Sequence, residues 1–176
     1  MEPGVEIADV PAPIAGQSDD ARSGTDGARR HSNMIGVHLV LQTEDSRVLL
    51  GRRLNTTFGQ GMYHLPAGHL EAVPGESLTV CAVREAAEEL GVTIDPADLV
   101  LAHVLHMHDL DDGRDRIQTF FRVRTWAGQI GNAEPEKCAG WEWHRIDRLP
   151  APLVDYTGLA LAAISANQPY SEHGWA

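Results

Sequence analysis

Residues 76–92 of this chain read ESLTVCAVREAAEELGV, and this stretch governs the interpretation of the rest of the sequence. Its apolar and small residues recur with helical spacing, and Gly91 follows at a position typical of a helix end. Glu76 lies at the start, where a negative charge suits the helix dipole. The stretch therefore predicts a helix over Glu76–Leu90.

Three glutamates share one side of this predicted helix. At about 100° per residue, Glu89 lies about 40° to one side of Glu85, and Glu88 lies about 60° to the other. We expect the opposite face to pack against the core, and it carries Thr79, Val80, Val83, Ala86, Ala87 and Leu90. Like charges near the negative end of a helix repel one another, and Arg84 offsets only part of this repulsion. A divalent cation offsets it better, whereas a solvated acidic face is the alternative interpretation.

The composition limits the classes of function. With 176 residues, of which 43% are hydrophobic, the chain has the size and apolar content of one folded domain with tails. The net charge of −11, without a Lys/Arg cluster, argues against a nucleic-acid polymer as partner. No apolar run is long enough to span a membrane and no signal pattern begins the chain, so we expect a cytoplasmic protein. Cys81 and Cys138 form no Cys-x-x-Cys pair, and free thiols are expected.

The composition also divides the chain into three parts. Residues 1–32 are rich in Gly, Pro, Ala, Asp and Ser and predict a disordered tail, residues 33–168 predict one domain, and residues 169–176 predict a C-terminal tail. Strands are predicted over Ile35–Gln42, Val48–Arg52, Met62–Leu65, Leu99–Met107, Ile117–Thr125 and Trp141–Ile146, and a closing helix over Asp155–Asn167. The fourth and fifth strands flank a turn and predict a hairpin. The order of elements predicts an α+β domain with a mixed sheet.

Residues 65–92 resemble the sequence motif of the Nudix hydrolase family. That motif begins with a glycine, five residues and a glutamate. Seven further residues then lead to Arg-Glu, an aliphatic residue, any residue, Glu-Glu, any residue, Gly and an aliphatic residue. Here Glu76 is followed after seven residues by Arg84-Glu85-Ala86-Ala87-Glu88-Glu89-Leu90-Gly91-Val92. Seven residues instead of five separate Gly68 from Glu76, which we interpret as a two-residue insertion near Ala72-Val73. The stretches 49–53 and 143–150 also fit the flanks of the family, so the resemblance extends over about residues 34–167.

The resemblance implies a fold, a cofactor and a reaction. The fold is an α/β/α sandwich in which a mixed sheet lies between helices and the motif forms a loop-helix-loop. Mg²⁺ or Mn²⁺ is implied as cofactor, with ligands from Glu85, Glu88, Glu89 and the carbonyl of Gly68. Arg84 would orient a glutamate of the motif, and Glu76 would pair with Arg84 as its structural partner. The reaction is hydrolysis of a diphosphate linkage, for which metal ions neutralise phosphoryl oxygens and activate water.

One carboxylate must accept the proton of the attacking water. Glu85 is our first choice for this general base, and Glu134, Glu136 and Glu142 remain alternatives.

Several residues outside the helix are candidates for binding substrate. Arg52 is the preferred phosphate contact, because its guanidinium is a forked donor at the end of a strand, and Arg53, Arg114 and Arg116 are alternatives. Tyr63 and His69 are further candidates. A base could stack on an aromatic ring, although aromatic residues in strands belong more often to the core; those considered are Phe58, Tyr63, Phe121, Trp141 and Trp143. We expect ordinary sheet or rim histidines, rather than a zinc site, at His103, His106 and His108.

Three functions are compatible with these residues. The preferred one is a hydrolase of nucleoside di- or triphosphates, because the glutamate helix is intact. The second is a pyrophosphatase acting on ADP-ribose, a nucleotide sugar or a dinucleotide, and the third is a Nudix fold that binds a ligand without catalysis. A small-molecule nucleotide is the expected partner, without a membrane, and the protein is expected to be a monomer or a homodimer.

Overall fold

The computed structural model describes residues 33–71, 75–109 and 113–175, which belong to one compact unit. The predicted tail over residues 1–32 and the predicted insertion at Ala72-Val73 lie outside the described residues.

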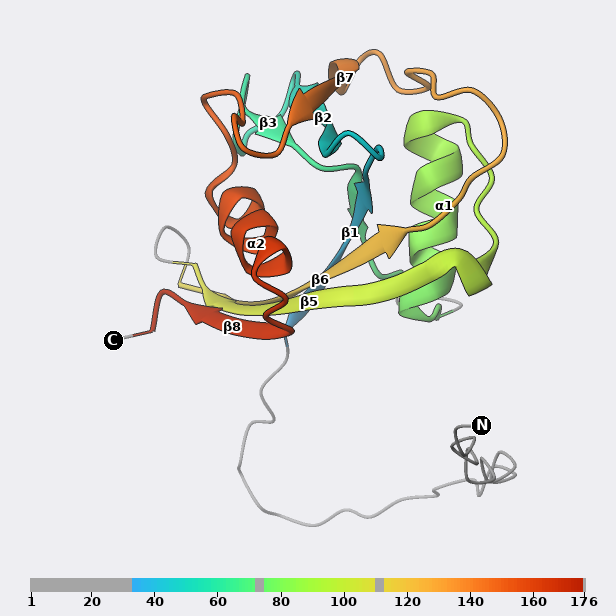
Figure 1. The fold of residues 1–176 in the computed structure, drawn as a ribbon. Helices are drawn as coiled ribbons and strands as arrows, with labels where there is room; N and C mark the ends of the chain where they lie inside the picture. The colour runs from blue at the N-terminus through green and yellow to red at the C-terminus, as the bar shows by residue number, and fades with distance from the viewer. Residues whose placement is uncertain (1–32, 72–74, 110–112, 176) are drawn as a thin grey trace, which may run out of the picture. The chain divides into compact units, whose positions relative to one another are not determined.

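A five-stranded mixed sheet, with the order β4-β1-β6-β5-β8, forms the centre of the fold (Figure 1). Its strands are β1 (Met34–Leu41), β4 (Ala67–His69), β5 (Leu99–His108), β6 (Asp115–Val123) and β8 (Tyr170–His173). β1 pairs in parallel with β6, and β5 pairs in parallel with β8, while the other two neighbours are antiparallel. The mixed sheet and the predicted hairpin of β5 and β6 are therefore confirmed.

The remaining strands form a second, antiparallel sheet with the order β3-β2-β7. They are β2 (Arg47–Arg53), β3 (Tyr63–His64) and β7 (Cys138–Arg145). β2 follows β1 through a turn, yet only the isolated bridge between Gln42 and Val48 joins the two strands. The predicted strands are thus present, but they are shared between two sheets.

Helix α1 (Leu78–Leu90) begins two residues later than predicted, because the Ser77 side chain caps it by accepting a hydrogen bond from the Val80 N–H. Glu76 therefore precedes the helix. Gly91 ends it with φ 69°, the left-handed conformation that glycine adopts without strain.

The prediction of which face of α1 packs against the core is partly wrong. The buried residues are Cys81, Ala82, Ala86 and Leu90, whereas Val80 is 53% exposed and Ala87 is also exposed. On the helical wheel the buried face extends toward Glu85 and Glu89, because β4 covers that side of the helix. The acidic stripe is consequently turned partly into the protein.

Two helices cover the central sheet. α1 contacts β1 and β4, and α2 (Asp155–Ser165) contacts β5, while a short 3₁₀ turn, η1 (Pro96–Asp98), leads into β5. Figure 1 shows α1 and α2 apart from each other with β1 and β6 between them. The architecture is the predicted α/β/α sandwich.

The core has two parts, one beside each helix. Alternate residues of β1 point to opposite faces, so Leu39 and Leu41 join the cluster under α1 while Val40 joins the cluster with Leu161 of α2. The central strand thereby ties both helices to one sheet.

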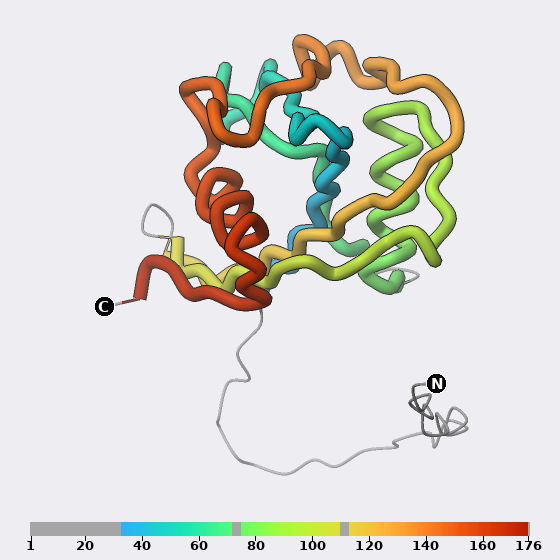
Figure 2. The backbone as a smooth tube through the Cα atoms, viewed as in Figure 1, coloured from blue at the N-terminus to red at the C-terminus, as the bar shows by residue number. Residues whose placement is uncertain are grey.

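Strand β8 lies in the segment predicted as a C-terminal tail. It runs beside β5, from which it is distant in sequence, as the backbone trace shows (Figure 2). Its sequence, YSEH, has no apolar run, because an edge strand needs only one partner and stays largely exposed. Among the described helices, none has the length and apolar character needed to cross a membrane.

Candidate active site

The centre of the candidate site is the contact between β4 and α1. β4 pairs with β1, and this pairing holds Gly68 directly beneath the Glu85 carboxylate. A Cβ atom at position 68 would overlap that carboxylate. Only glycine therefore allows the helix to bring Glu85 so close to the β4 backbone.

Arg84 holds the acidic groups together. Its guanidinium donates to Glu76 at 2.8 and 3.2 Å, to Glu85 at 2.7 Å and to Glu88 at 3.0 Å, and it also donates to the carbonyl of His69 at 3.2 Å. The hydrogen bonds from Arg84 hold the pKa of Glu76 near 2. This carboxylate therefore stays ionised and anchors the guanidinium.

Glu85 and Glu89 face the protein, and burial raises the pKa of both carboxyls. For Glu89 the pKa rises to about 8, with the charges of Glu85 and Glu134 adding to burial and a hydrogen bond from the Ala67 N–H opposing it. Holding both groups ionised at neutral pH is costly unless a positive charge joins them.

The described residues contain no group of three His, Cys, Asp or Glu side chains already arranged as metal ligands. In this arrangement Arg84 donates to Glu85 and Glu88, while the Ala67 N–H donates to Glu89. The donor set nevertheless suits a hard cation, because it consists of carboxylates with an unfavourable like-charge cluster.

These groups line a cavity of about 390 Å³, here called the acidic cavity. Its glutamates are Glu85, Glu88, Glu89 and Glu134. Of the alternative general bases, only Glu134 lines it, whereas Glu136 and Glu142 do not, and the Glu142 side chain is 72% exposed.

A second cavity of about 220 Å³, here called the aromatic cavity, lies on the other side of β4. The two cavities share Arg53, Ala67, Gly68 and His69. Phe58 and Tyr156 line the aromatic cavity with parallel rings whose centroids are 6.3 Å apart. The neighbouring cavities can thus accept a charged group and a flat ring from one molecule.

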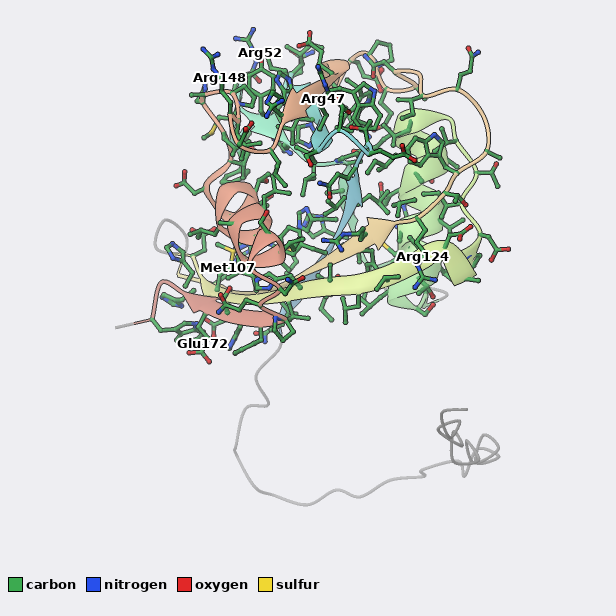
Figure 3. All side chains as sticks on the ribbon, viewed as in Figure 1. Arg47, Arg52, Met107, Arg124, Arg148 and Glu172 are labelled. Carbon is green, nitrogen blue, oxygen red and sulfur yellow. The ribbon has the colours of Figure 1, made fainter. Side chains whose placement is uncertain are left out.

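The arginine predicted to bind phosphate lies elsewhere. Arg52 donates to the carbonyl of Gly61 at 3.1 Å and lines neither cavity, and Figure 3 shows it pointing outward. Arg53 lines both cavities, because successive residues of β2 point to opposite faces. Arg116, another alternative, lines the aromatic cavity and pairs with Asp109 at 3.2 Å.

Of the other residues considered for substrate binding, some line a cavity and others do not. His69 lines both cavities, and burial followed by the charges of Arg116 and Arg53 lowers its pKa. Tyr63 lines neither cavity and packs its ring against His144. Among the other aromatic residues, Phe58 lines the aromatic cavity and Trp141 the acidic one, whereas Phe121 is buried in the core and Trp143 stacks on Trp126.

The histidines of β5 are sheet residues, as expected. His103 is buried and bonded to the carbonyl of Gln168 and the hydroxyl of Ser171. His106 and His108 both lie against Trp175.

The residues of the aromatic cavity that sequence reasoning missed include His38, Gln118 and Tyr156. His38 interrupts the apolar run of β1, and this interruption was an available signal. Its ring nitrogen Nε2 is 2.9 Å from Gln118 Oε1, and burial lowers the pKa of His38 to about 4. The cavity floor is thus a neutral polar pair.

Comparisons with known proteins agree with this geometry. The NUDIX domain model matches residues 32–162. The chain is 32% identical over 126 residues to the NAD-capped RNA hydrolase NudC of Stutzerimonas stutzeri, covering 71% of this chain and 41% of that protein. It is 27% identical over 138 residues to the RNA pyrophosphohydrolase of Novosphingobium aromaticivorans, covering 69% of this chain and 82% of that protein.

Solved structures share the fold of this chain. The MutT NUDIX hydrolase from Burkholderia pseudomallei matches with a TM-score of 0.66 and 25% identity, over 75% of this chain and 98% of that one. The MutT protein from Methanosarcina mazei shares the fold with a TM-score of 0.64 and 22% identity, over 79% of this chain and 97% of that one. The chain spans about two-fifths of the length of its NudC relative. It is also 27% identical over 134 residues, 74% of this chain, to a putative nudix hydrolase from Caenorhabditis elegans, of whose length it spans about a third. From the domain match, the fold and the glutamate helix together, the chain belongs to the Nudix hydrolase family.

Proposed function

We propose that this chain hydrolyses a diphosphate linkage in a nucleotide substrate, with divalent cations held by the glutamates of α1. The observation that carries the proposal is the burial of two like-charged carboxylates, Glu85 and Glu89, against β4 beside Gly68. Such a cluster is unfavourable by itself, and Mg²⁺ or Mn²⁺ with oxygen ligands relieves it.

The ligands in this proposal are Glu85, Glu88, Glu89 and the carbonyl of Gly68. Bound cations would neutralise charge on the phosphoryl oxygens and lower the pKa of a bound water. Arg84 then has to share Glu85 and Glu88 with the cations, and its two hydrogen bonds to Glu76 keep the guanidinium in place as it does so. Arg53, on the shared wall, is the side chain we propose for binding a phosphate oxygen.

For the proton acceptor we propose Glu85, which lines the acidic cavity with a side chain that is 12% exposed. Glu134 is the alternative, because it lines the same cavity, although Lys137 binds its carboxylate at 2.6 Å. Glu136 and Glu142 lie outside that cavity and are weaker alternatives.

The aromatic cavity is the proposed place for the nucleoside. Phe58 and Tyr156 offer ring faces for a base, and the Arg53 guanidinium lies 5.7 Å from the centre of the Phe58 ring. Base and diphosphate would then lie on the two sides of β4.

The test is turnover of a substrate panel with Mg²⁺ and with Mn²⁺. The panel contains nucleoside triphosphates and diphosphates, ADP-ribose, NAD and dinucleoside polyphosphates, with products identified by mass. We expect Glu85→Gln to lower kcat by about a hundredfold or more and a chelator to abolish turnover. Glu44→Gln is the matched control and should keep wild-type activity, because that side chain is exposed and lines neither cavity.

Two results would contradict the proposal. Turnover that survives both Glu85→Gln and the chelator would remove the chemistry from α1. A folded protein that binds panel members without cutting any of them would favour a ligand-binding module.

A dinucleotide is the second candidate substrate. The NudC relative, which is 32% identical, is named for hydrolysis of NAD-capped RNA. The net charge of −11 disfavours a long RNA as partner, so NAD itself is the form we propose to test first.

A further inference from the structure

Three buried polar atoms at one wall of the acidic cavity have no hydrogen-bond partner within the described part of the chain. They are His64 Nε2, Asn132 Oδ1 and Trp141 Nε1, and all three residues line this cavity. They come from β3, from the loop before β7 and from β7 itself. Buried polar atoms are nearly always paired, so three unpaired ones in one wall indicate a place where a ligand supplies hydrogen bonds.

The fold holds these side chains together by means of a glycine. His64 and Trp141 are both register partners of Gly51, on the two sides of β2. A Cβ at position 51 would lie 2.7 Å from Trp141 Cζ3, so glycine leaves room for the indole, whose centroid lies 5.2 Å from that of the His64 ring. Asn132 is fixed nearby, because its Nδ2 donates to the carbonyl of Cys138 at 2.8 Å. That bond leaves the Asn132 oxygen free.

The chemical character of the three atoms is defined. Nδ1 of His64 is 2.7 Å from the Leu65 carbonyl, to which it can only donate, and burial with the nearby charge of Arg53 lowers the His64 pKa to about 4. The ring is therefore neutral, with its proton on Nδ1 and a lone pair on Nε2. Asn132 Oδ1 is a second acceptor, and Trp141 Nε1 is a donor.

Two acceptors and one donor are complementary to hydroxyl groups, because each hydroxyl both donates and accepts. A terminal phosphate at neutral pH offers almost only acceptors. It would leave His64 and Asn132 unsatisfied and would add negative charge beside Glu134.

We propose that the acidic cavity selects substrates in which the group beyond the diphosphate carries hydroxyls, as a sugar does, and that His64, Asn132 and Trp141 bind these hydroxyls. The inference rests on the proposed function and narrows it to a nucleoside diphosphate linked to a sugar or a second nucleoside, in preference to a nucleoside triphosphate. The three atoms are almost fully buried, so binding includes a small rotation of side chains, which the half-buried Asn132 and Trp141 allow.

The test compares ADP-ribose with the methyl ester of ADP, which has the same diphosphate diester but no hydroxyl beyond it, and with ATP. In the wild type we expect kcat/KM for ADP-ribose to exceed that for the methyl ester by about tenfold or more. His64→Phe and Trp141→Phe should each reduce this ratio about fivefold, because each removes the atom proposed to bind a hydroxyl and keeps a ring. The matched control is His106→Phe, which also removes an Nε2 without a hydrogen-bond partner, lies outside both cavities and should leave the ratio unchanged.

Thermal unfolding of the variants separates binding from folding. His64→Phe removes a buried unpaired atom and also the hydrogen bond from Nδ1 to the Leu65 carbonyl, whereas Trp141→Phe breaks no hydrogen bond within the described part of the chain. Trp141→Phe is therefore the deciding variant if His64→Phe unfolds below the assay temperature. Equal kcat/KM for ADP-ribose and the methyl ester, a preference for ATP, or an unchanged ratio in both ring variants would overturn the inference while leaving the proposed function intact. No turnover of any of the three substrates by the wild type would instead contradict the proposed function as well.

Discussion

At the scale of single residues, Gly68 has a sharply defined role, because any side chain there would displace the Glu85 carboxylate. We expect Gly68→Ala to lower kcat by about a hundredfold, since a displacement of about 1 Å at a catalytic group has an effect of that size. Steady-state kinetics on the best substrate of the panel provide the measurement, with thermal unfolding as a check on the fold. A Gly68→Ala enzyme with wild-type kcat would show that the position of Glu85 above β4 is not needed.

The residue scale also shows what the sequence could and could not predict about the site. The three glutamates and Arg84 were predictable, because helical spacing and the family resemblance both act within a single element. Arg53 lines the cavities and Arg52 does not, because adjacent strand residues face opposite ways and the sequence does not say which side of β2 meets β4. Asn132 and Tyr156 reach the cavities only through tertiary packing, so no local pattern marks them.

At the scale of elements, substitutions of two glycines test the backbone conformation of α2 and of the end of α1. Gly158 lies within α2, where an added Cβ would meet only Leu153 Cδ2 at 3.4 Å, an ordinary contact. Gly158→Ala should therefore raise the free energy of unfolding by about 0.5–1 kcal/mol through helix propensity. Gly91 has φ 69° at the end of α1, and Gly91→Ala should lower the free energy of unfolding by about 1 kcal/mol.

Urea unfolding of these two variants forms a matched pair, because the same methyl group is added in each. Stabilisation by Gly91→Ala would contradict the left-handed end of α1. Gly158→Ala also serves as the activity control for Gly68→Ala, since position 158 lines neither cavity.

The elements differed in how well the sequence predicted them. β1, β5 and β6 carry apolar runs because they are central strands, and the predicted ranges differ from the observed ones only at the ends. β8 is short, polar and paired at one edge, so its sequence cannot be distinguished from that of a tail. The division of the strands into two sheets depends on pairing between distant segments, which no local pattern specifies.

At the scale of the whole molecule, the buried histidines couple stability to pH. The pKa of His64 is about 4 in the folded protein, so between about pH 4 and pH 6.5 the unfolded chain binds a proton that the native state does not. This histidine therefore lowers the free energy of unfolding by up to about 1.4 kcal/mol for each pH unit below 6.5. Glu89 has a raised pKa, so it increases the free energy of unfolding as the pH falls from about 8 to 4.5 and opposes the effect of His64. The contribution of His64 is therefore isolated by comparing the wild type with a variant that lacks this histidine.

The comparison is between the wild type and His64→Phe, in urea titrations from pH 7 to pH 4.5. The variant should gain stability relative to the wild type as the pH falls below 6.5, whereas the difference should be constant above pH 7. A difference that stays constant over the whole range would mean that His64 is not held neutral by burial.

The three-residue strand β4 separates the acidic cavity from the aromatic cavity, and four residues belong to both walls. This arrangement has a consequence for inhibitor chemistry. A chelating fragment and a flat aromatic fragment, each a weak binder, can be joined by a linker only long enough to pass the backbone of Gly68. The second fragment then binds as an intramolecular step at high effective concentration, so the joined compound gains affinity without any new contact.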